Sequence, residues 1–144
     1  MSATHPPELV IYIDGGSRGN PGPSGFGVHA VDGKGAVIAE HFGFIGVATN
    51  NVAEYSALVH AFRLAAARGA RHIEIRSDSE LVVKQMNGIY KVKHPDMQVL
   101  WRQASQLRRT FEGAEIKHVR REQNKDADAL ANRAMDLKQS HLAD

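Results

Sequence analysis

Four acidic residues lie where the local sequence predicts that a strand ends or a helix begins: Asp14, Glu54, Asp78 and Asp128. Asp14 follows an apolar run and Asp78 follows an alternating one, while Glu54 and Asp128 lie where first turns of helices are expected. Four carboxylates that converge without matching cations repel one another strongly. With oxygen ligands, no cysteine and no paired histidine, these residue types favour a shared hard cation, Mg²⁺ or Mn²⁺.

Each acid also has a purely structural explanation. Asp14 is in a position to start a turn, and Glu54 to interact with a helix dipole or take part in a cap. Asp78 is in a position to cap the helix that follows it. Asp126 lies about 200° from Asp128 around the helix, so we expect it to face solvent. Taken alone, only Asp14 favours a functional role, so the prediction depends on the four carboxylates lying together.

A glycine-rich loop follows Asp14 and contains Gly15, Gly16 and Gly19. A dinucleotide-binding loop is the rival explanation, but the spacing is not GxGxxG and the next element is expected to be a strand. Asp14 would also repel a pyrophosphate. The loop therefore does not favour a dinucleotide.

Hydrophobic patterning predicts an α/β fold. Alternation and an Asp-Gly hairpin turn at residues 32–35 predict three antiparallel strands within residues 9–44. The α/β alternation that follows implies right-handed crossovers to parallel strands. The result is a mixed five-stranded sheet, three antiparallel strands and then two parallel, flanked by helices. The expected helices cover residues 51–69, 79–87, 96–110 and 124–138, and the two later strands cover residues 72–77 and 114–119.

The predicted topology gathers the four acids at one edge. Ligands of open α/β sheets collect beyond the carboxyl ends of the parallel strands, where helices begin. All four acids fall at that edge. The elements therefore predict the convergence on which the metal site depends.

The chain has 144 residues, enough for one domain, which we expect over residues 9–138 with flexible ends at residues 1–8 and 139–144. It has no cysteine, and its N-terminus, MSATHPPE, has neither the basic start nor the apolar stretch of a signal peptide. No run of about 18 apolar residues is present. These features predict a cytoplasmic protein without membrane association, and the lack of an extra apolar face predicts a monomer.

The net charge of +2 is unevenly distributed. Residues 84–121 hold nine Lys and Arg against three acids, so the remainder of the chain is negative. A basic segment beside an acidic remainder suits a polyanion held next to a metal-binding cluster. An ordinary solvated helix face explains the same charges equally well.

Four segments together resemble type 1 ribonuclease H: "DGGSRGNPGPSGFG", "TNNVAEY", "SDSELVVKQMNG" and "REQNKDADALAN". They occur in register from about residue 9 to residue 137, and each carries one of the four acids. The chain is also similar to the ribonuclease H domains of reverse transcriptases. Only "GIYKVKHP" stands where some members carry a long basic protrusion, so the chain resembles a member without it.

The resemblance implies an endonuclease that cuts the RNA strand of an RNA/DNA hybrid and leaves 3′-hydroxyl and 5′-phosphate ends. Asp14, Glu54, Asp78 and Asp128 would hold two Mg²⁺ ions about 4 Å apart, with Mn²⁺ as a substitute. One ion would lower the pKa of the attacking water, and the other would stabilise the departing 3′-oxygen. Gly15 and Gly16 would let a sugar–phosphate backbone come close.

The resemblance also implies residues that contact the RNA: Gly15, Asn20, Asn50, Asn51 and Glu80. For Asn50 and Asn51, helix capping is an alternative, and Thr49 is a second candidate for the cap. Glu80 replaces the Gln of well-known bacterial members, so it can accept a hydrogen bond from a 2′-hydroxyl but cannot donate one.

Some members carry a mobile His in the loop before the last helix, where it helps product leave. His118 falls within the preceding strand pattern, so that role does not carry over to it. Arg120 or Arg121 can take its place as a cation near the departing phosphate, and each is equally explained as a surface Arg that stabilises the loop.

Two other function classes remain open. A non-catalytic hybrid-binding module of the same fold would have no reason to keep four mutually repelling acids. A metal-dependent phosphatase or phosphotransferase would need an enclosed pocket, whereas Asn20, Asn50 and Asn51 indicate an open groove. The residues therefore favour the nuclease.

Overall fold

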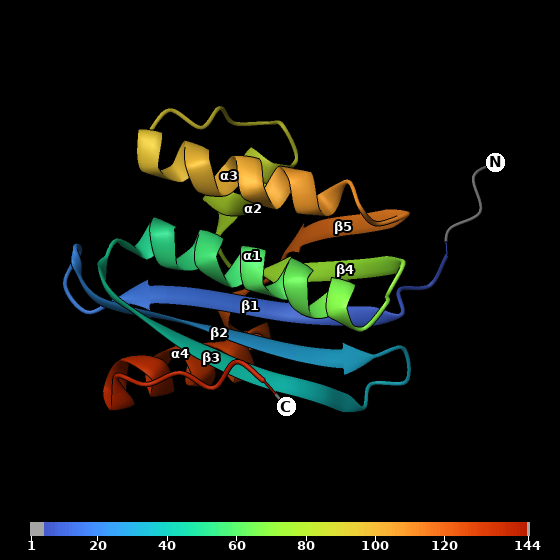
Figure 1. The fold of residues 1–144 in the computed structure, drawn as a ribbon, viewed down its shortest axis with the longest axis horizontal. Helices are drawn as coiled ribbons and strands as arrows, with labels where there is room; N and C mark the ends of the chain where they lie inside the picture. The colour runs from blue at the N-terminus through green and yellow to red at the C-terminus, as the bar shows by residue number, and fades with distance from the viewer. Residues whose placement is uncertain (1–4, 144) are drawn as a thin grey trace.

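The computed structural model describes residues 5–143, which form a five-stranded sheet with helices on both faces (Figure 1). The strand order is β3-β2-β1-β4-β5. β1, β2 and β3 are antiparallel neighbours, whereas β4 is parallel to β1 and to β5, which confirms the predicted mixed sheet. The strands are β1 Leu9–Ser17, β2 Gly22–Asp32, β3 Val37–Ala48, β4 His72–Ser77 and β5 Gly113–His118. The helices are α1 Asn50–Ala67, α2 Glu80–Met86, α3 Pro95–Arg108 and α4 Lys125–Leu137, with a short 3₁₀ helix at Arg121–Gln123.

The helices lie on opposite faces of the sheet. α1 packs along β1 on one face, with α3 beside it, and α4 crosses β2 and β1 on the other (Figure 1). Apolar strand residues such as Ile11, Ile13 and Ile75 meet the apolar side of α1, including Leu58 and Phe62, and all five are buried. This packing holds α1 and β1 in one rigid relation, which matters because both carry predicted site residues.

β1 does not end at Asp14, contrary to the prediction. Its parallel pairing with β4 stops at Ile13, opposite Ser77, but its antiparallel pairing with β2 continues to Ser17. Asp14 is therefore the first residue of β1 that lies beyond the end of β4. The strand continues because the residues after Asp14 still have β2 as a partner.

Two glycines let the helices approach the sheet closely. A Cβ atom built at Gly15 would lie 2.4 Å from backbone atoms of both Ala53 and Glu54 in α1. One built at Gly27 of β2 would lie 2.2 Å from the Ala127 carbonyl oxygen in α4. Residue 15 must therefore be glycine because α1 packs directly against it. The sequence predicted only that Gly15 lets a nucleic-acid backbone come close.

Helix boundaries follow local signals. Thr49 is the N-cap of α1 and its side chain accepts from the Val52 N–H, while Gly69 at φ +72° follows the end of the helix. Ser79, not Asp78, caps α2. The residues between α2 and α3 form no additional helix, which confirms the absence of a long protrusion.

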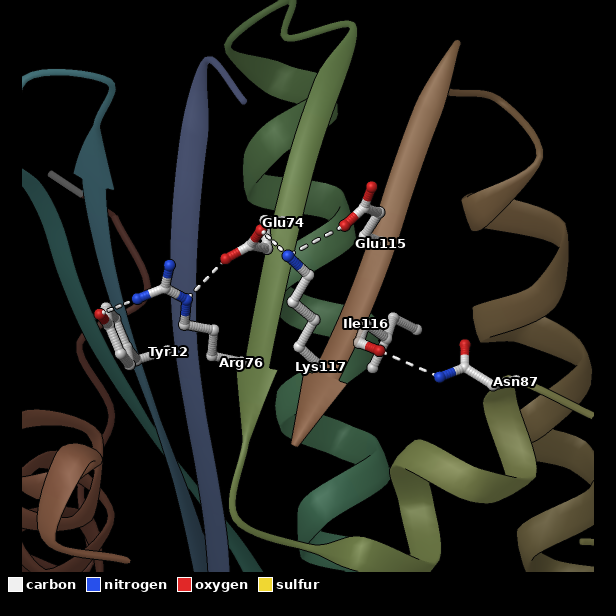
Figure 2. Close-up of polar contacts among 7 residues, drawn as sticks. All are labelled: Tyr12, Glu74, Arg76, Asn87, Glu115, Ile116 and Lys117. Atoms are coloured by element: carbon white, nitrogen blue, oxygen red, sulfur yellow. Dashed lines mark hydrogen bonds and ion pairs between the residues drawn. The ribbon is translucent and has the colours of Figure 1, made fainter. Parts of the chain in front are cut away.

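The sheet face of β4 and β5 opposite α1 carries a polar network (Figure 2). Arg76 donates to the Tyr12 hydroxyl and to Glu74, each at 2.6 Å. The Lys117 ammonium lies 2.9 Å from Glu74 and 3.2 Å from Glu115. Side chains alternate across a strand, so Glu74 and Arg76 face away from the apolar core.

Both terminal stretches that were expected to be flexible contact the sheet. Glu8 accepts two backbone hydrogen bonds at the start of β4, and His141 forms an isolated antiparallel bridge with Phe42. Residues 1–4 and 144 lie outside the described part of the chain, and flexibility of the ends stays a prediction. Among residues 5–143, no helix is long and apolar enough to cross a bilayer.

Candidate active site

Three of the predicted acids meet at the edge of the sheet. Asp14 of β1, Glu54 of α1 and Asp78, which directly follows β4, each offer a carboxylate oxygen within 4.8 Å of the others. Asp128 in the first turn of α4 lines the same open hollow and interacts with the Asp14 carboxyl group. The structure therefore brings together all four acids that were chosen from the sequence.

Glu54 lies one residue further into its helix than predicted, which places it just beyond the first turn. α1 begins at Asn50, so Glu54 is its fifth residue and the first turn contains no acid. An interaction with the first-turn dipole does not explain it, because that effect fades within the first turn. Asp126 is exposed, as expected.

The hollow raises the pKa of two of its carboxyl groups, those of Asp14 and Glu54. Burial is the main cause for Asp14, which is 9% exposed, and the charge of Asp78, contact with Asp128 and the charge of Glu54 add to it. Burial also raises the pKa of Glu54 to about 7, although a hydrogen bond from Ser79 and the charge of Arg121 oppose the rise. Both carboxylates are therefore costly to ionise in the absence of a cation.

The donor set fits a divalent cation. Among residues 5–143, none of the four acids forms an ion pair with Lys or Arg. The Glu54 Oε2 atom is buried and has no hydrogen-bond partner in this part of the chain. Carboxylate oxygens that converge without a paired cation are the ligands that hard cations prefer. An ion at this place would satisfy both the lone oxygen and the unbalanced charge.

Two of the predicted RNA-contacting residues are held in place by backbone groups. Asn50 Oδ1 accepts from the Ser17 N–H at 2.8 Å, and Asn20 Oδ1 accepts from the Asn50 N–H at 3.1 Å. The alternative that Asn50 caps α1 is therefore wrong. Asn20 instead accepts the hydrogen bond from the first N–H of α1. Both hydrogen bonds are made to side-chain oxygens, so they do not use the Nδ2 donors of Asn20 and Asn50.

The other predicted contact residues lie around the same edge. Gly15 is buried and its backbone lines the hollow, while Asn51 is half-buried in the first turn of α1. Glu80 is exposed and is paired with Lys84 at 2.6 Å, and the Lys84 ammonium lies 5.0 Å above the Tyr90 ring. The carboxylate of Glu80 is therefore already engaged by a cation.

The structure separates the two candidate arginines. Arg121 lines the hollow, and its charge lowers the pKa of Glu54. Arg120 is not among the residues that line the hollow, and its backbone N–H donates to the Gln123 side chain. Of the pair, Arg121 is the one in reach of the acids.

Sequence reasoning missed Arg18. Arg18 lines the hollow from the glycine-rich loop and donates to Asp136 at 2.5 Å and to Asn132 at 3.2 Å, both on α4. These partners are more than 110 residues away in the chain, so no local pattern could have indicated them.

Residues 12–134 match the protein family described as Reverse transcriptase-like. Ribonuclease HI of Halobacterium salinarum is 47% identical over 125 residues, which cover 87% of this chain and 63% of that protein. The chain belongs to the type 1 ribonuclease H family. A bifunctional protein of Mycobacterium tuberculosis is 48% identical over 140 residues, which cover 95% of this chain and 38% of its own length. The chain thus spans less than two thirds of these curated relatives.

Solved structures of the family superpose closely on this member. RNase H1 of Halobacterium salinarum gives a TM-score of 0.86 at 46% identity, covering 89% of this chain and 97% of that one. LC11-RNase H1 in complex with an RNA/DNA hybrid gives the same TM-score at 41% identity, covering 90% and 98% of the two chains. The family likeness therefore includes the fold that positions the acids.

Proposed function

We propose that this chain is an endonuclease that hydrolyses the RNA strand of RNA/DNA hybrids and leaves 3′-hydroxyl and 5′-phosphate ends. The observation that carries the proposal is the convergence of Asp14, Glu54 and Asp78, with Asp128 beside them and no Lys or Arg paired to any of the four within residues 5–143. The hybrid bound to the related LC11-RNase H1 supports the substrate class.

The four acids are the proposed ligands of two Mg²⁺ ions, with Mn²⁺ as a substitute. When bound, these ions supply positive charge that lowers the pKa of the attacking water and stabilises the leaving 3′-oxygen. The chain contributes a pre-built arrangement of negative oxygens. Packing holds Asp14 on β1, and the Ser79 hydroxyl orients Glu54, so little reorganisation is needed for the acids to act together.

The RNA strand is proposed to lie across the glycine-rich loop and the start of α1. Selectivity for RNA requires groups that sense a 2′-hydroxyl in the wide minor groove of a hybrid. Asn20 and Asn50 suit this, because backbone hydrogen bonds to their oxygens hold their Nδ2 donors in place. The proposed contacts are Gly15, Asn20, Asn50, Asn51 and Glu80.

Arg121 is the proposed contact for the departing phosphate. It lies at the rim of the hollow, where it opposes the negative charge of Glu54. A cation there attracts a phosphate once the bond is cut. We therefore propose this role for Arg121 and not for Arg120.

The test is a set of end-labelled duplexes of one sequence, RNA/DNA, RNA/RNA and DNA/DNA, incubated with Mg²⁺ or with excess chelator. Cleavage of only the RNA strand in the hybrid, only with metal, and with phosphatase-sensitive 5′ ends, is the expected result. Cleavage that persists in chelator contradicts the mechanism. Hybrid binding without cleavage favours the non-catalytic module, and hydrolysis of small phosphate esters alone favours a phosphatase.

A further inference from the structure

Asn124 is a buried polar residue next to the acidic hollow that the proposed function leaves unexplained. It is 1% exposed and lies between the 3₁₀ helix and α4, at the N-cap position of α4. Its Nδ2 group donates to the Ile13 carbonyl at 2.8 Å, across 111 residues of sequence. Its Oδ1 atom is buried without a partner in the described part of the chain.

The side chain of Asn124 does not do what an N-cap asparagine usually does. At this position Asn normally accepts a hydrogen bond from the N–H groups of the first helical turn. Here no such bond forms, although the Oδ1 atom is present and unpartnered. A buried acceptor without a partner is destabilising. The Asn124 side chain therefore does not cap α4 and instead donates a hydrogen bond to β1.

The two bonds of Asn124 join the chain segments that carry two of the acids. Ile13 immediately precedes Asp14 and is the last residue of β1 that pairs with β4. The Asn124 backbone carbonyl accepts from the Asp128 N–H at 3.0 Å, which is the ordinary first hydrogen bond of α4 and places Asp128 one turn beyond Asn124. One residue is therefore hydrogen-bonded beside Asp14 through its side chain and to Asp128 through its backbone.

We propose that Asn124 is a positioning residue that sets the spacing of Asp14 and Asp128 for divalent cation binding. This inference rests on the proposed function, because it concerns the same hollow. A neutral amide suits the task, since it supplies a donor to the Ile13 carbonyl without adding a fifth negative charge to the cluster. Leu or Ala would pack without an orphaned acceptor, but would leave β1 and α4 unlinked at this point.

The test compares Asn124→Ala with Asn87→Ala in the full chain. Asn87 is the control, because its Nδ2 also donates to a strand carbonyl, that of Ile116 at 3.0 Å (Figure 2), and it does not line the acidic hollow. Unlike Asn124 it is exposed, and its Oδ1 accepts from Arg108. Binding of Mg²⁺ and of Mn²⁺ to each folded protein is measured by calorimetry without substrate. We expect affinity about tenfold weaker for Asn124→Ala and unchanged for Asn87→Ala.

Asn124→Ser keeps the test decisive if the alanine variant does not fold. Serine is a strong N-cap residue, so it supports the start of α4, yet its hydroxyl is too short to replace the Nδ2 contact with β1. The same tenfold loss of metal affinity is expected. Wild-type affinity in a folded Asn124 variant overturns the positioning role.

Cleavage assays separate the two proposals. Weaker Mg²⁺ binding should appear as a higher Mg²⁺ concentration for half-maximal cleavage in the Asn124 variants, with activity recovered at high Mg²⁺. If wild type binds Mg²⁺ but cuts no hybrid, the proposed function fails while the difference in metal affinity still tests Asn124. If the Asn124 variants bind metal and cut hybrids as wild type does, only the positioning role fails.

Discussion

Two buried carboxylates of the same sheet have opposite surroundings. Asp14 is 9% exposed and Glu74 is 7% exposed, so burial alone does not distinguish them. Glu74 lies between Arg76 and Lys117 at 2.6 and 2.9 Å (Figure 2), whereas the charged groups that shift the pKa of Asp14 are other acids. Burial raises the pKa of each, but hydrogen bonds from Lys117 and Arg76 outweigh it at Glu74 and leave that pKa lowered.

The difference indicates what each acid is for. Glu74 has its cations built into the chain, so its charge is balanced and it serves to join β4 to β5. Asp14 has no paired Lys or Arg among residues 5–143, so the charge it would carry must be balanced from solution. A buried carboxylate points to a ligand site when its neighbours fail to neutralise it, and burial by itself does not.

The largest expected effect is on catalysis. Asp14→Asn and Asp78→Asn should each lower the rate of hybrid cleavage in Mg²⁺ by about 10³-fold or more, because each removes a cation ligand. Glu74→Gln should stay within about threefold of wild type, because that network lies away from the hollow. Single-turnover cleavage of a labelled hybrid measures both. A comparable loss in Glu74→Gln would end the distinction between the two acids.

The same substitutions should change stability in opposite directions. Asp14→Asn removes repulsion and should raise the free energy of unfolding by about 1–2 kcal/mol, as substitutions at strained functional sites often do. Glu74→Gln should lower it by about 1–2 kcal/mol, because Arg76 and Lys117 lose their partner and both are partly exposed. Urea unfolding in chelator tests the sign, and a shift of both variants in one direction would contradict the comparison.

Divalent cations should stabilise only the proteins with an intact hollow. Mg²⁺ at about ten times its Kd should raise the Tm of wild type by roughly 3–5 °C, because it binds the native state and not the unfolded chain. Glu74→Gln should show the same increase and Asp14→Asn little or none. Thermal unfolding followed by circular dichroism, with and without Mg²⁺, measures this difference.

The smallest effect is on the pH dependence of stability. The pKa of Glu54 is raised from 4.5 to about 7, so its favourable protonation in the native state is complete below pH 4.5 and is lost as the pH rises through 7. In chelator, stability should therefore fall by about 1 kcal/mol or more over this window, and Glu54→Gln should remove that part of the fall. The lowered pKa of Glu74 acts in the opposite sense, since its contribution is present above pH 4.5 and is lost below it.

Much of the fold followed from local patterns. Alternation of apolar residues predicted the strands, and Thr49 and Gly69 marked the ends of α1, because capping and turn preferences act within a few residues. The convergence of the four acids was predictable because each lies near the end of a strand or the start of a helix. Their convergence then depended only on the order of strands in the sheet.

Other features depended on contacts between distant segments. The continuation of β1 past Asp14 needed β2 as a partner, and the role of Gly15 needed the backbone of α1 against it. The links from Arg18 to Asp136 and from Asn124 to Ile13 each cross more than 100 residues. Local propensities carry no signal for such pairs.

The amino-acid sequence by itself determined which acids stand at the ends of secondary-structure elements, and in what order those elements occur. Its patterns singled out Asp14, which follows the apolar run in "IYID", but they gave no sign that Glu74, inside the alternating strand "IEIR", is buried as well. Tertiary structure decided that Lys117, far along the chain, reaches one of them while Glu54, Asp78 and Asp128 surround the other. The reason is that charge interactions act through space, so the state of a buried carboxylate depends on which segments fold against it.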